Sequence, residues 1–546
     1  MKGAVMVRFL KAVSIGLVVV LSGLSWGAHP RDSLTIGYLQ YSDSLMPLLS
    51  GMASTRLVAG FVLRPVTVTD EHNQLGCLLC DELPTFENGQ AKSIEVDGKV
   101  RHEVTFRLKE GLLWSDGRPL TADDVIFTWD VIRYREPSNF RGIDEIRKID
   151  ERTFVVVRSK MTVEYNSLDG IYVLARHLAE DAFLTNPKEF HIHAPYVASP
   201  TRAGLYSGPY VIRDVEVGRS IVLERNSFWR GPKPPFERIV LLAYDQAAPL
   251  GVALMAGDID MICGEAGYTE FDAQQLQKTL GRRHRIDLVQ SMRYERIAFN
   301  FSNPILQDRR VRQALKLGLD RKTLVRNLFG QEPINFVYRQ ELETEDIKYD
   351  RTEAIRLLEE AGWQASGGVR VKSGTPLTLT LSTTSGQPGR LLVAQAVQSA
   401  WRKIGVRLQI EPQVPRVLFG EILPKGRFDL ELTAIVGTHD EATILTGLFG
   451  SDAIPTESNG WIGHNYGRYS NPRFDQLLLT LESIIDKAER RKLLQRLYAL
   501  AAEDAIDIPL YSPRVPYILP DWLEVRGSPN TTSSSLWVEH WKISER

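Results

Sequence analysis

The sequence has few cysteines, no excess of charge of either sign and, after its N-terminus, no long hydrophobic run. Three cysteines in 546 residues are too few for a disulfide scaffold or for the clustered ligands of structural zinc sites. A formal net charge of -1, from 66 Lys and Arg against 67 Asp and Glu, argues against nucleic acid or an anionic membrane as a partner. With 43% hydrophobic and 24% charged residues, the composition is that of a globular protein with several cores.

The common catalytic motifs are also missing. The chain contains no His-Glu-x-x-His, Gly-x-x-x-x-Gly-Lys-Ser/Thr, Gly-x-Gly-x-x-Gly or Ser-x-x-Lys motif, and we expect neither a metal nor a cofactor. One Gly-x-Ser-x-Gly match, at 23–27, falls in an N-terminal export signal and not at the strand-to-helix turn that a nucleophile elbow needs. These absences favour binding over catalysis, although a triad assembled from distant residues leaves no local pattern.

The first 27 residues have the pattern of a secretory signal peptide. Three basic residues precede a charge-free apolar run at 12–24, and the small residues Ser25 and Gly27 follow it. We expect cleavage after Gly27; the alternative is an uncleaved anchor, but the run is shorter than the roughly 20 residues that span a bilayer. The mature protein is therefore expected in the periplasm.

Two short patterns leave alternatives open. Cys77 and Cys80 have the spacing of a redox pair, but Asp81 and Glu82 follow them, whereas a reactive thiolate needs cationic neighbours or a helix N-terminus. A small structural disulfide or two buried thiols is the simpler interpretation. His191 and His193 are predicted on one side of an extended segment, where they could ligate a metal or form an ordinary surface pair.

Hydrophobic spacing predicts a mixed α/β fold. Period-two alternation indicates strands, and spacing of three to four residues indicates helices. The Thr121 hydroxyl is placed to cap one helix, and Asp350 with Glu353 can box the start of another. A strand, a helix and a strand between 377 and 410 form a βαβ unit, which implies parallel strands. The expected strands are 34–38, 101–108, 221–223, 377–381 and 406–410, and the expected helices are 122–132, 350–361, 393–404 and 471–504 with a break near 486.

Four segments resemble the large solute-binding proteins of peptide ABC importers, the oligopeptide, dipeptide and nickel-binding family. The first, FRLKEGLLWSDGRPLTADDVIF at 106–127, is similar to the family's most recognisable signature. The others are SGPY at 207–210 with LERN and FW after it, LMAGDID at 254–260 followed by AFNF and DRRVRQAL, and IPLY at 508–511. Together and in this order they cover about residues 34 to 515.

The resemblance implies a two-lobed α/β periplasmic-binding-protein (Venus flytrap) fold with an extra subdomain inserted in the first lobe. It also implies a ligand held between the lobes and delivered to an inner-membrane ABC permease with its ATPase, by a protein expected to be a monomer. Trp114, Gly117 and Arg312 are expected to be fold markers and not ligand contacts. The order of motifs divides the chain into a signal peptide at 1–27, lobe one at 28–65, 200–292 and 510–546, an inserted subdomain at 66–199, and lobe two at 293–509.

Every peptide offers the same backbone groups for binding, whatever its sequence. In the peptide-binding members of the family that the chain resembles, a buried carboxylate pairs with the ammonium group of the peptide. That acidic residue is expected about nine positions after Phe428-Asp429, where this chain has Thr438 with Asp440 two residues on. Either Asp440 serves, or the ligand lacks a free amine. The candidate ligand-binding residues are Tyr38, Gln40, Thr438, His439, Asp440, Trp461 and Tyr511.

Two other functions remain as alternatives to peptide capture. One is a secreted hydrolase with a dispersed triad. The other keeps the fold but binds a metal chelate, haem or an oligosaccharide, or has a sensory role. We expect no catalytic residue and no nucleic-acid partner.

Overall fold

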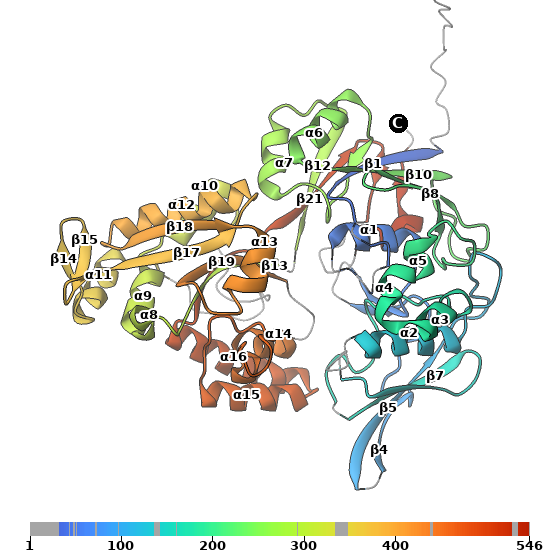
Figure 1. The fold of residues 1–546 in the computed structure, drawn as a ribbon, viewed down its shortest axis with the longest axis horizontal. Coiled ribbons are helices and arrows are strands. Elements are labelled where there is room, and N and C mark those ends of the chain that lie inside the picture. The colour runs from blue at the N-terminus through green and yellow to red at the C-terminus, as the bar shows by residue number, and fades with distance from the viewer. Residues whose placement is uncertain are drawn as a thin grey trace, which may run out of the picture.

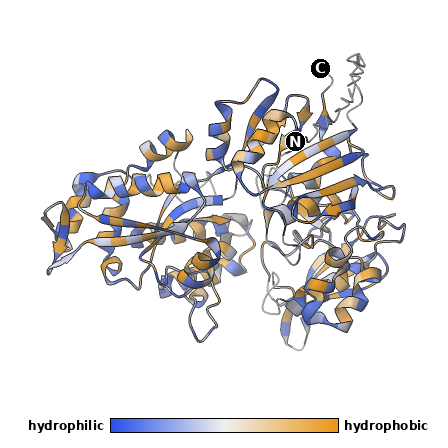
Figure 2. Cartoon of the chain, turned by 45° about the horizontal axis from the view of Figure 1, so that its top comes forward, coloured by the Kyte–Doolittle hydropathy of each residue, from blue (hydrophilic) through white to orange (hydrophobic). Residues whose placement is uncertain are grey.

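The structure is a computed structural model, and its two halves lie side by side and meet at one edge (Figure 1). It describes residues 32–544 except 43, 47, 49, 51, 71–73, 97, 136–141, 160, 292, 333–347, 437–440 and 527–532. The expected signal peptide, with its Gly-x-Ser-x-Gly match, therefore lies outside the described residues. Hydrophobic residues follow the strands of the sheets and the helix faces that cover them (Figure 2), as expected for packed α/β layers.

A seven-stranded mixed sheet forms the first lobe. Its central strand β1 pairs in parallel with β10 and β11, because crossover segments carrying helices separate these strands along the chain. The sheet confirms the strands expected at 34–38 and 221–223. In order across the sheet, the strands are β12 (His284–Gln290), β21 (Arg514–Pro520), β11 (Met261–Ile262), β1 (Ser33–Leu39), β10 (Arg238–Tyr244), β9 (Ser220–Arg225) and β8 (Tyr210–Glu216). The helices packed on this lobe are α1 (Ala53–Val62), α6 (Ala247–Ala256) and α7 (Glu270–Gln277).

A four-stranded antiparallel sheet belongs to the segment between β1 and β8. One hydrophobic core runs from this segment into the first lobe without a break, so the two pack as one body. The sheet order is β4 (Ala91–Val96), β5 (Lys99–Arg107), β7 (Thr153–Arg158) and β6 (Glu145–Lys148). The helices of this segment are α2 (Ala122–Arg135), α3 (Arg176–Thr185), α4 (Phe190–His193) and α5 (Pro195–Ala198), and the hairpin is β2 (Thr67–Thr69) with β3 (Leu75–Cys77).

The structure describes both residue pairs for which the sequence left alternatives, the two cysteines and the two histidines. Cys77 and Cys80 form a disulfide, the structural alternative that the sequence left open. The extended segment expected at His191 and His193 is wrong, since both lie on the short helix α4. His191 there contacts the Lys188 carbonyl and His193 contacts Glu189, on an exposed surface.

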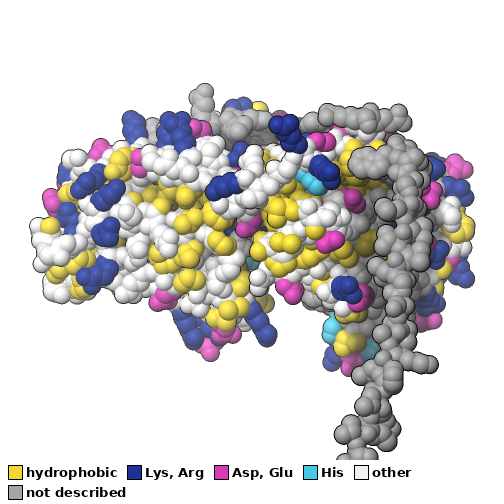
Figure 3. All heavy atoms as spheres, turned by 90° about the horizontal axis from the view of Figure 1, so that it is seen from above, with side chains coloured by type: hydrophobic (Ala, Val, Ile, Leu, Met, Phe, Trp, Pro, Cys, Tyr) yellow, Lys and Arg dark blue, Asp and Glu magenta, His cyan; other side chains and the backbone are white. Residues whose placement is uncertain are grey.

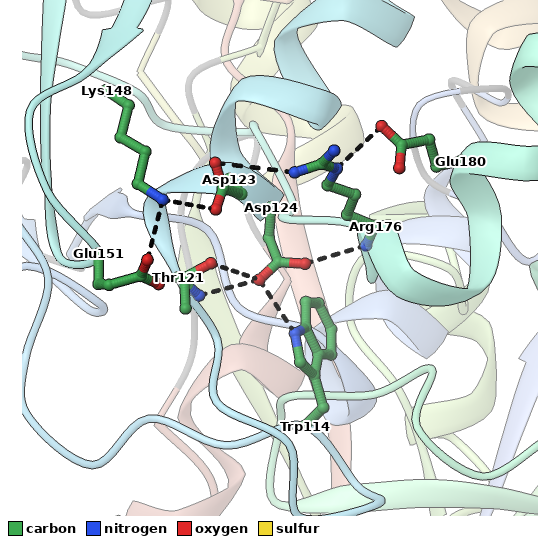
Figure 4. Close-up of polar contacts among 8 residues, drawn as sticks. All are labelled: Trp114, Thr121, Asp123, Asp124, Lys148, Glu151, Arg176 and Glu180. Atoms are coloured by element: carbon green, nitrogen blue, oxygen red, sulfur yellow. Dashed lines mark hydrogen bonds and ion pairs between the residues drawn. The ribbon is translucent and has the colours of Figure 1, made fainter.

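The signature at 106–127 forms a polar cluster around the Asp124 carboxylate (Figure 4). Asp124 accepts hydrogen bonds from Trp114 Nε1 at 3.3 Å and from the backbone N–H groups of Thr121 at 2.8 Å and Arg176 at 2.9 Å. Thr121 was expected to cap α2, but here the side chain of Asp124 bonds back to the Thr121 N–H. Gly117 has a φ of +83°, a conformation that favours glycine. These residues hold the subdomain together, as expected for fold markers.

A five-stranded sheet forms the second lobe, with helices on both faces. Its strands are, in order, β18 (Arg407–Gln413), β17 (Thr378–Thr384), β19 (Leu430–Val436), β13 (Arg293–Phe299) and β20 (Asp507–Tyr511). One face packs against α8 (Pro304–Gln307), α9 (Arg309–Leu317), α10 (Arg321–Phe329), α11 (Arg351–Glu360) and α12 (Pro388–Arg402). The other packs against α14 (Glu441–Phe449), α15 (Pro472–Ser483) and α16 (Lys487–Asp504). Small elements in this lobe are β14 (Gln364–Ser366), β15 (Val369–Lys372), β16 (Thr375–Pro376) and α13 (Pro415–Val417).

Several predictions for this lobe are confirmed. β17, α12 and β18 form the expected βαβ unit with parallel strands. The side chain of Asp350 accepts the Glu353 N–H at 2.9 Å and so caps α11. The break expected near Asp486 separates α15 from α16, and Asp486 caps the second helix.

Two short segments connect the lobes. β12 of the first sheet leads into β13 of the second, and β20 returns to β21. The Ser512 hydroxyl donates to the carbonyls of Ser291 at 2.8 Å and Arg293 at 2.7 Å, and the Ser291 hydroxyl donates to the Pro513 carbonyl. The two crossing segments are therefore bonded to each other, which is the arrangement of a hinge.

The lobes also touch beside the hinge, where α7 of the first lobe faces α12 of the second. Glu270 on α7 accepts a hydrogen bond from Gln331 Nε2 at 2.7 Å, and a Cβ at Gly389 would lie 3.0 Å from the Phe271 Cβ. When the molecule is seen from above the view of Figure 1, hydrophobic side chains gather along the middle of the surface over both lobes (Figure 3).

Candidate functional site

A cavity of about 410 Å³ lies at the junction of the two lobes. The first lobe contributes the N-terminus of α1, the loop 264–269 and the start of α7, and the second lobe contributes β13 and the N-terminus of α12. Both crossing segments also line it, through Ser291 and Pro513. The volume falls in the usual range of small-ligand pockets, roughly 300–1,000 Å³. Any change in the angle between the lobes alters this cavity.

The α1 helix presents an uncapped N-terminus to the cavity. Met52 is its N-cap and makes no capping hydrogen bond through its side chain. Met52, Ala53 and Ser54 all line the cavity. Ser54 is only 2% exposed, and its hydroxyl has no hydrogen-bond partner among the described residues. A buried hydroxyl without a partner is uncommon because leaving it unbonded costs free energy. This group is therefore available to a ligand.

Two of the cavity glutamates are paired with arginines. Glu295 on β13 binds Arg390 on α12, with Arg390 Nε 3.0 Å from Glu295 Oε2. Glu270 on α7 binds Arg514 on β21, with Arg514 Nε 2.8 Å from Glu270 Oε1. Opposite charges at this distance neutralise each other locally. These four side chains stiffen the cavity wall and leave little net charge for a ligand.

The third glutamate of the cavity, Glu265, is held by neutral donors. Its Oε1 accepts from the Tyr517 hydroxyl and from the Ser534 N–H, both at 2.6 Å. Burial raises the pKa of the Glu265 carboxyl, and the hydrogen bonds from Tyr517 and Ser534 act against that rise. Burial thus favours its neutral form.

Two further arginines, Arg56 and Arg293, face the same cavity. Burial lowers the pKa of the Arg56 guanidinium and the like charge of Arg293 acts in the same direction, whereas Tyr172 and the Glu265 carboxyl act against this decrease. The Arg293 side chain makes no hydrogen bond or ion pair within the part of the chain that the structure describes. The described lining therefore carries more positive than negative charge, four arginines against three glutamates.

The predicted ligand residues differ in how they relate to this cavity. Gln40 and Tyr511 line it, and Tyr511 stacks on Phe329 with ring centroids 4.2 Å apart. Tyr38 is completely buried in the core of the first lobe, because it points to the covered side of β1. Trp461 is half-buried in a loop of the second lobe and is not among the lining residues.

Three of the predicted residues, Thr438, His439 and Asp440, lie outside the described residues. The structure therefore does not decide between Asp440 and a ligand without an amine. Burial raises the pKa of Tyr511 well above its usual value, so this residue stays a neutral hydroxyl at physiological pH. For all seven residues a ligand-binding role stays a prediction.

The sequence interpretation missed Ser54, Arg56, Arg293 and Arg390. Arg293 begins a strand in which Glu295 and Arg296 are also charged, and charged residues in a strand buried on both faces need partners or a function. The charged residues in this strand could therefore have indicated a functional site. The apolar start of α1 at Met52-Ala53, with no capping residue, was a second one.

Among the described residues, no group of three or more His, Cys, Asp or Glu side chains could hold a metal ion. Within the same residues, no helix is both long enough and apolar enough to cross a membrane. The geometry as described is that of a hinged cavity with a cationic lining.

Comparisons with known proteins identify similar chains. The family model "Bacterial extracellular solute-binding proteins, family 5 Middle" matches residues 85–455. The oligopeptide-binding protein AppA of Bacillus subtilis is 25% identical over 479 residues, which is 84% of this chain and 84% of that protein.

Solved structures share the fold over nearly the whole length. AppA of Bacillus subtilis in complex with a nonapeptide superimposes with a TM-score of 0.71 at 23% identity, covering 94% of this chain and 99% of that one. NikA of Brucella suis in complex with Fe(III)-EDTA gives a TM-score of 0.77 at 18% identity, covering 94% and 100%. The two-lobed α/β fold expected from the sequence is therefore confirmed.

Proposed function

The chain belongs to family 5 of the bacterial extracellular solute-binding proteins, and we propose that it captures peptides between its lobes and delivers them to an ABC permease. The resemblance described in the sequence is confirmed at the level of the family. AppA, its relative in Bacillus subtilis, is named an oligopeptide-binding protein, and this supports peptides as the ligand class. The permease, its ATPase, a monomeric state and export by the first 27 residues are parts of the same proposal.

The observation that carries the proposal is the cavity between the lobes. Its walls come from both lobes and its floor from the two crossing segments, so a ligand that contacts both walls stabilises the closed form. A shift from about 1:99 to 99:1 in favour of closure needs roughly 5.5 kcal/mol of preferential binding. No covalent step is needed for this task.

The lobe boundaries belong to the proposal as well. Strand membership supports lobe one at 28–65, 200–292 and 510–546 and lobe two at 293–509, with 66–199 as an insert. The proposed boundary at 509/510 falls inside β20, which ends at Tyr511. We place the hinge at Ser291 and at Ser512-Pro513.

The decisive experiment identifies the ligand directly. Mature protein is purified, the small molecules that co-purify are analysed by mass spectrometry, and ligand-free protein is then mixed with peptides of two to nine residues under native conditions. Intact peptides retained at a one-to-one ratio support the proposal. Release of shortened peptides would instead support the secreted hydrolase, and a co-purified chelate, haem or oligosaccharide would support the other alternative.

A matched pair of variants connects retention to the cavity. Tyr511→Ala removes an aromatic wall of the cavity and should weaken peptide retention about tenfold, because one aromatic contact contributes about 1 kcal/mol or more. Tyr134→Ala removes an aromatic side chain that is 45% exposed on α2, away from the cavity lining, and should bind as the wild type does. Equal losses in both variants would remove the cavity from the proposal.

The ammonium site is tested separately. If Asp440 pairs with a peptide ammonium group, Asp440→Asn should weaken binding of free peptides but not of N-acetylated ones. Unchanged affinity for free peptides would remove this assignment and leave a ligand without a free amine.

A further inference from the structure

We propose that Gln331 is a positioning residue for ligand capture, because it joins Glu270 and Arg514 in a polar latch that holds the two lobes in the arrangement in which the cavity exists. The latch consists of these three side chains and the Phe329 carbonyl. The inference rests on the proposed function in one respect, namely that the ligand occupies the cavity between the lobes. It adds a residue that sets affinity from outside the cavity lining.

The first lobe contributes the N-terminus of α7 to the latch. Glu270 is the first residue of this helix and is only 4% exposed, and an acidic side chain is favoured in the first turn of a helix. Its carboxylate accepts hydrogen bonds from the Arg514 backbone N–H at 2.9 Å and from Arg514 Nε at 2.8 Å. Arg514 begins β21 directly after Pro513 of the hinge. α7 is therefore bonded to the segment that crosses between the lobes.

The second lobe contributes the end of α10. Gly330 ends this helix with a φ of +62°, a conformation that favours glycine. The next residue, Gln331, donates from Nε2 to Glu270 Oε2 at 2.7 Å. Arg514 Nη2 donates to the Phe329 carbonyl at 2.8 Å, where the last turn of a helix has unpaired carbonyls and a partial negative charge. Both of these bonds join one lobe to the other.

A tight contact between α7 and α12 lies beside the latch (Figure 1). A Cβ at Gly389 would lie 3.0 Å from the Phe271 Cβ, so at this point the two helices touch with no room for a side chain between them. A hydrogen bond is lost when its donor and acceptor move apart by about 1 Å. The latch and the helix contact therefore exist together only over a narrow range of angles between the lobes.

The cavity needs the same arrangement of the lobes. Its walls come from both lobes, and all residues of the latch and of the helix contact line it except Gln331. A ligand that contacts both walls and a latch that joins them favour the same lobe angle, so their stabilising effects are coupled. Without the latch, fewer molecules have both walls in place, and the apparent affinity falls by that fraction.

Gln331 is the residue that separates this effect from direct contact with the ligand. Glu270 and Arg514 line the cavity, and removing either of them leaves the other without its counter-charge. Gln331→Ala removes one hydrogen bond and changes no lining residue. Its matched control is Gln277→Ala, because Gln277 is exposed at the end of α7 and lies outside the lining.

The first experiment measures affinity. The probe is a peptide of two to nine residues that the wild type retains intact. Gln331→Ala should weaken its binding about threefold to tenfold, because the latch loses a hydrogen bond to a charged group, and Gln277→Ala should bind as the wild type does. Unchanged affinity in Gln331→Ala, or an equal loss in the control, would overturn the inference while peptide capture stands.

A second experiment needs no ligand. Phe271→Cys and Gly389→Cys place two thiols across the contact between α7 and α12. A disulfide needs Cβ atoms about 3.5–4.5 Å apart, so this pair bonds while the lobes hold the arrangement described. Cys77 and Cys80 are already paired and Cys263 is buried, so oxidised glutathione acts on the new pair.

The rate of bond formation tests the latch itself. Adding Gln331→Ala to the cysteine pair should slow it at least about threefold, whereas adding Gln277→Ala should not. Equal rates, or thiols that never pair, would overturn the latch even if no peptide binds. A slower rate in a protein that binds no peptide supports the latch and rejects the proposed function.

The disulfide also provides a rescue. Once oxidised, the protein with Gln331→Ala should bind peptide as tightly as the oxidised protein that keeps Gln331, because the covalent bond replaces the latch. Reduction should restore the difference between the two. An affinity that stays low after oxidation would show that Gln331 does not act through the lobe arrangement, and would overturn its role as a positioning residue.

Discussion

Two arginines on the same strand illustrate the difference between a residue that holds the fold and one that is left for a ligand. Arg293 and Arg296 both lie on β13, but side chains of a strand alternate between its faces, so they point to opposite sides of the sheet. Arg296 is only 2% exposed and binds Glu431 at 3.0 Å and Asp507 at 3.4 Å. Arg293 faces the cavity and has no such partner among the described residues.

The difference lies in what surrounds each guanidinium, not in the residue type. Neighbouring strands bring Glu431 and Asp507 to Arg296, and the Phe449 ring lies 5.6 Å from its guanidinium carbon. A buried charge with partners belongs to the folded structure and costs much to disturb. A cavity charge without a partner is tolerated because water solvates it until a ligand replaces the water. Each prediction below changes one side of this comparison.

The largest effect is expected from Arg296→Met. The substitution leaves Glu431 buried without its counter-charge and removes one of the cations near Asp507, beside which Lys316 and Arg321 remain. Removing one partner from a buried ion pair costs about 3–5 kcal/mol. Urea unfolding followed by tryptophan fluorescence measures the change. Arg309→Met is the matched control, because Arg309 is half exposed and pairs with Glu503 at 3.2 Å, where such pairs contribute about 1 kcal/mol or less. Similar losses in both variants would contradict the distinction between the two environments.

The second largest effect is expected at Asp124, the buried carboxylate at the centre of the signature. Asp124→Ala leaves the Trp114 N–H and the N–H groups of Thr121 and Arg176 without their acceptor, which should cost about 2–3 kcal/mol. The neighbouring Asp123 pairs with Lys148 at 2.7 Å and is one-third exposed, so Asp123→Ala should cost about 1 kcal/mol or less. Thermal unfolding of the two variants gives the comparison.

Asp124 also separates stability from binding. Among the described residues, none of those between 66 and 199 lines the cavity, so Asp124→Ala should bind ligand as the wild type does at temperatures where it is folded. A loss of affinity in the folded variant would show that this cluster acts on the site.

These clusters explain which parts of the molecule the sequence could predict. The βαβ unit at 377–413 depends on residues close in the chain, so spacing indicated it correctly. The Asp124 cluster was not predicted, because one of its donors, the Arg176 N–H, is separated from Asp124 by 52 positions. The cavity is built from segments as distant as Ser54, Arg293 and Arg514, and no local pattern records their meeting. The helix at His191 was also missed, since two residues of alternation fit a strand and a short helix equally well.

The prediction of Tyr38 as a cavity residue illustrates the same limit. A tyrosine after a first strand was expected to reach the ligand, but alternation along β1 turns Tyr38 into the covered core and Leu39 toward the opposite face. Gln40 lies after the end of β1, has a φ of +62° and lines the cavity. Which face of a strand is covered depends on the helices packed on it, and these come from elsewhere in the chain. Hydrophobic spacing therefore predicted the strand, but it did not predict which of its side chains face the core and which face the cavity.

A smaller effect concerns pH. Lys316 on α9 lies near Asp507, and burial lowers its pKa to about 8 from an unfolded value of 10.5. Between these values the unfolded chain binds more protons than the folded one, so this group makes the protein more stable as the pH rises from about 8 toward 9.5. The slope for one proton is at most about 1.4 kcal/mol per pH unit. Urea midpoints across this range should rise less in Lys316→Met than in the wild type; parallel curves would contradict the assignment.

The smallest effect on stability is expected where the effect on the ligand is largest. Arg293→Gln removes a charge that has no described partner and that repels Arg56, so the free energy of unfolding without ligand should change by less than about 0.5 kcal/mol, or rise. Arg293 lines the cavity, so the same variant should reduce the stabilisation that a bound peptide gives the wild type, measured by the ligand-dependent shift in Tm. If Arg293→Gln unfolds as easily as Arg296→Met, the two arginines both belong to the fold, and the cavity has no free cation at this position.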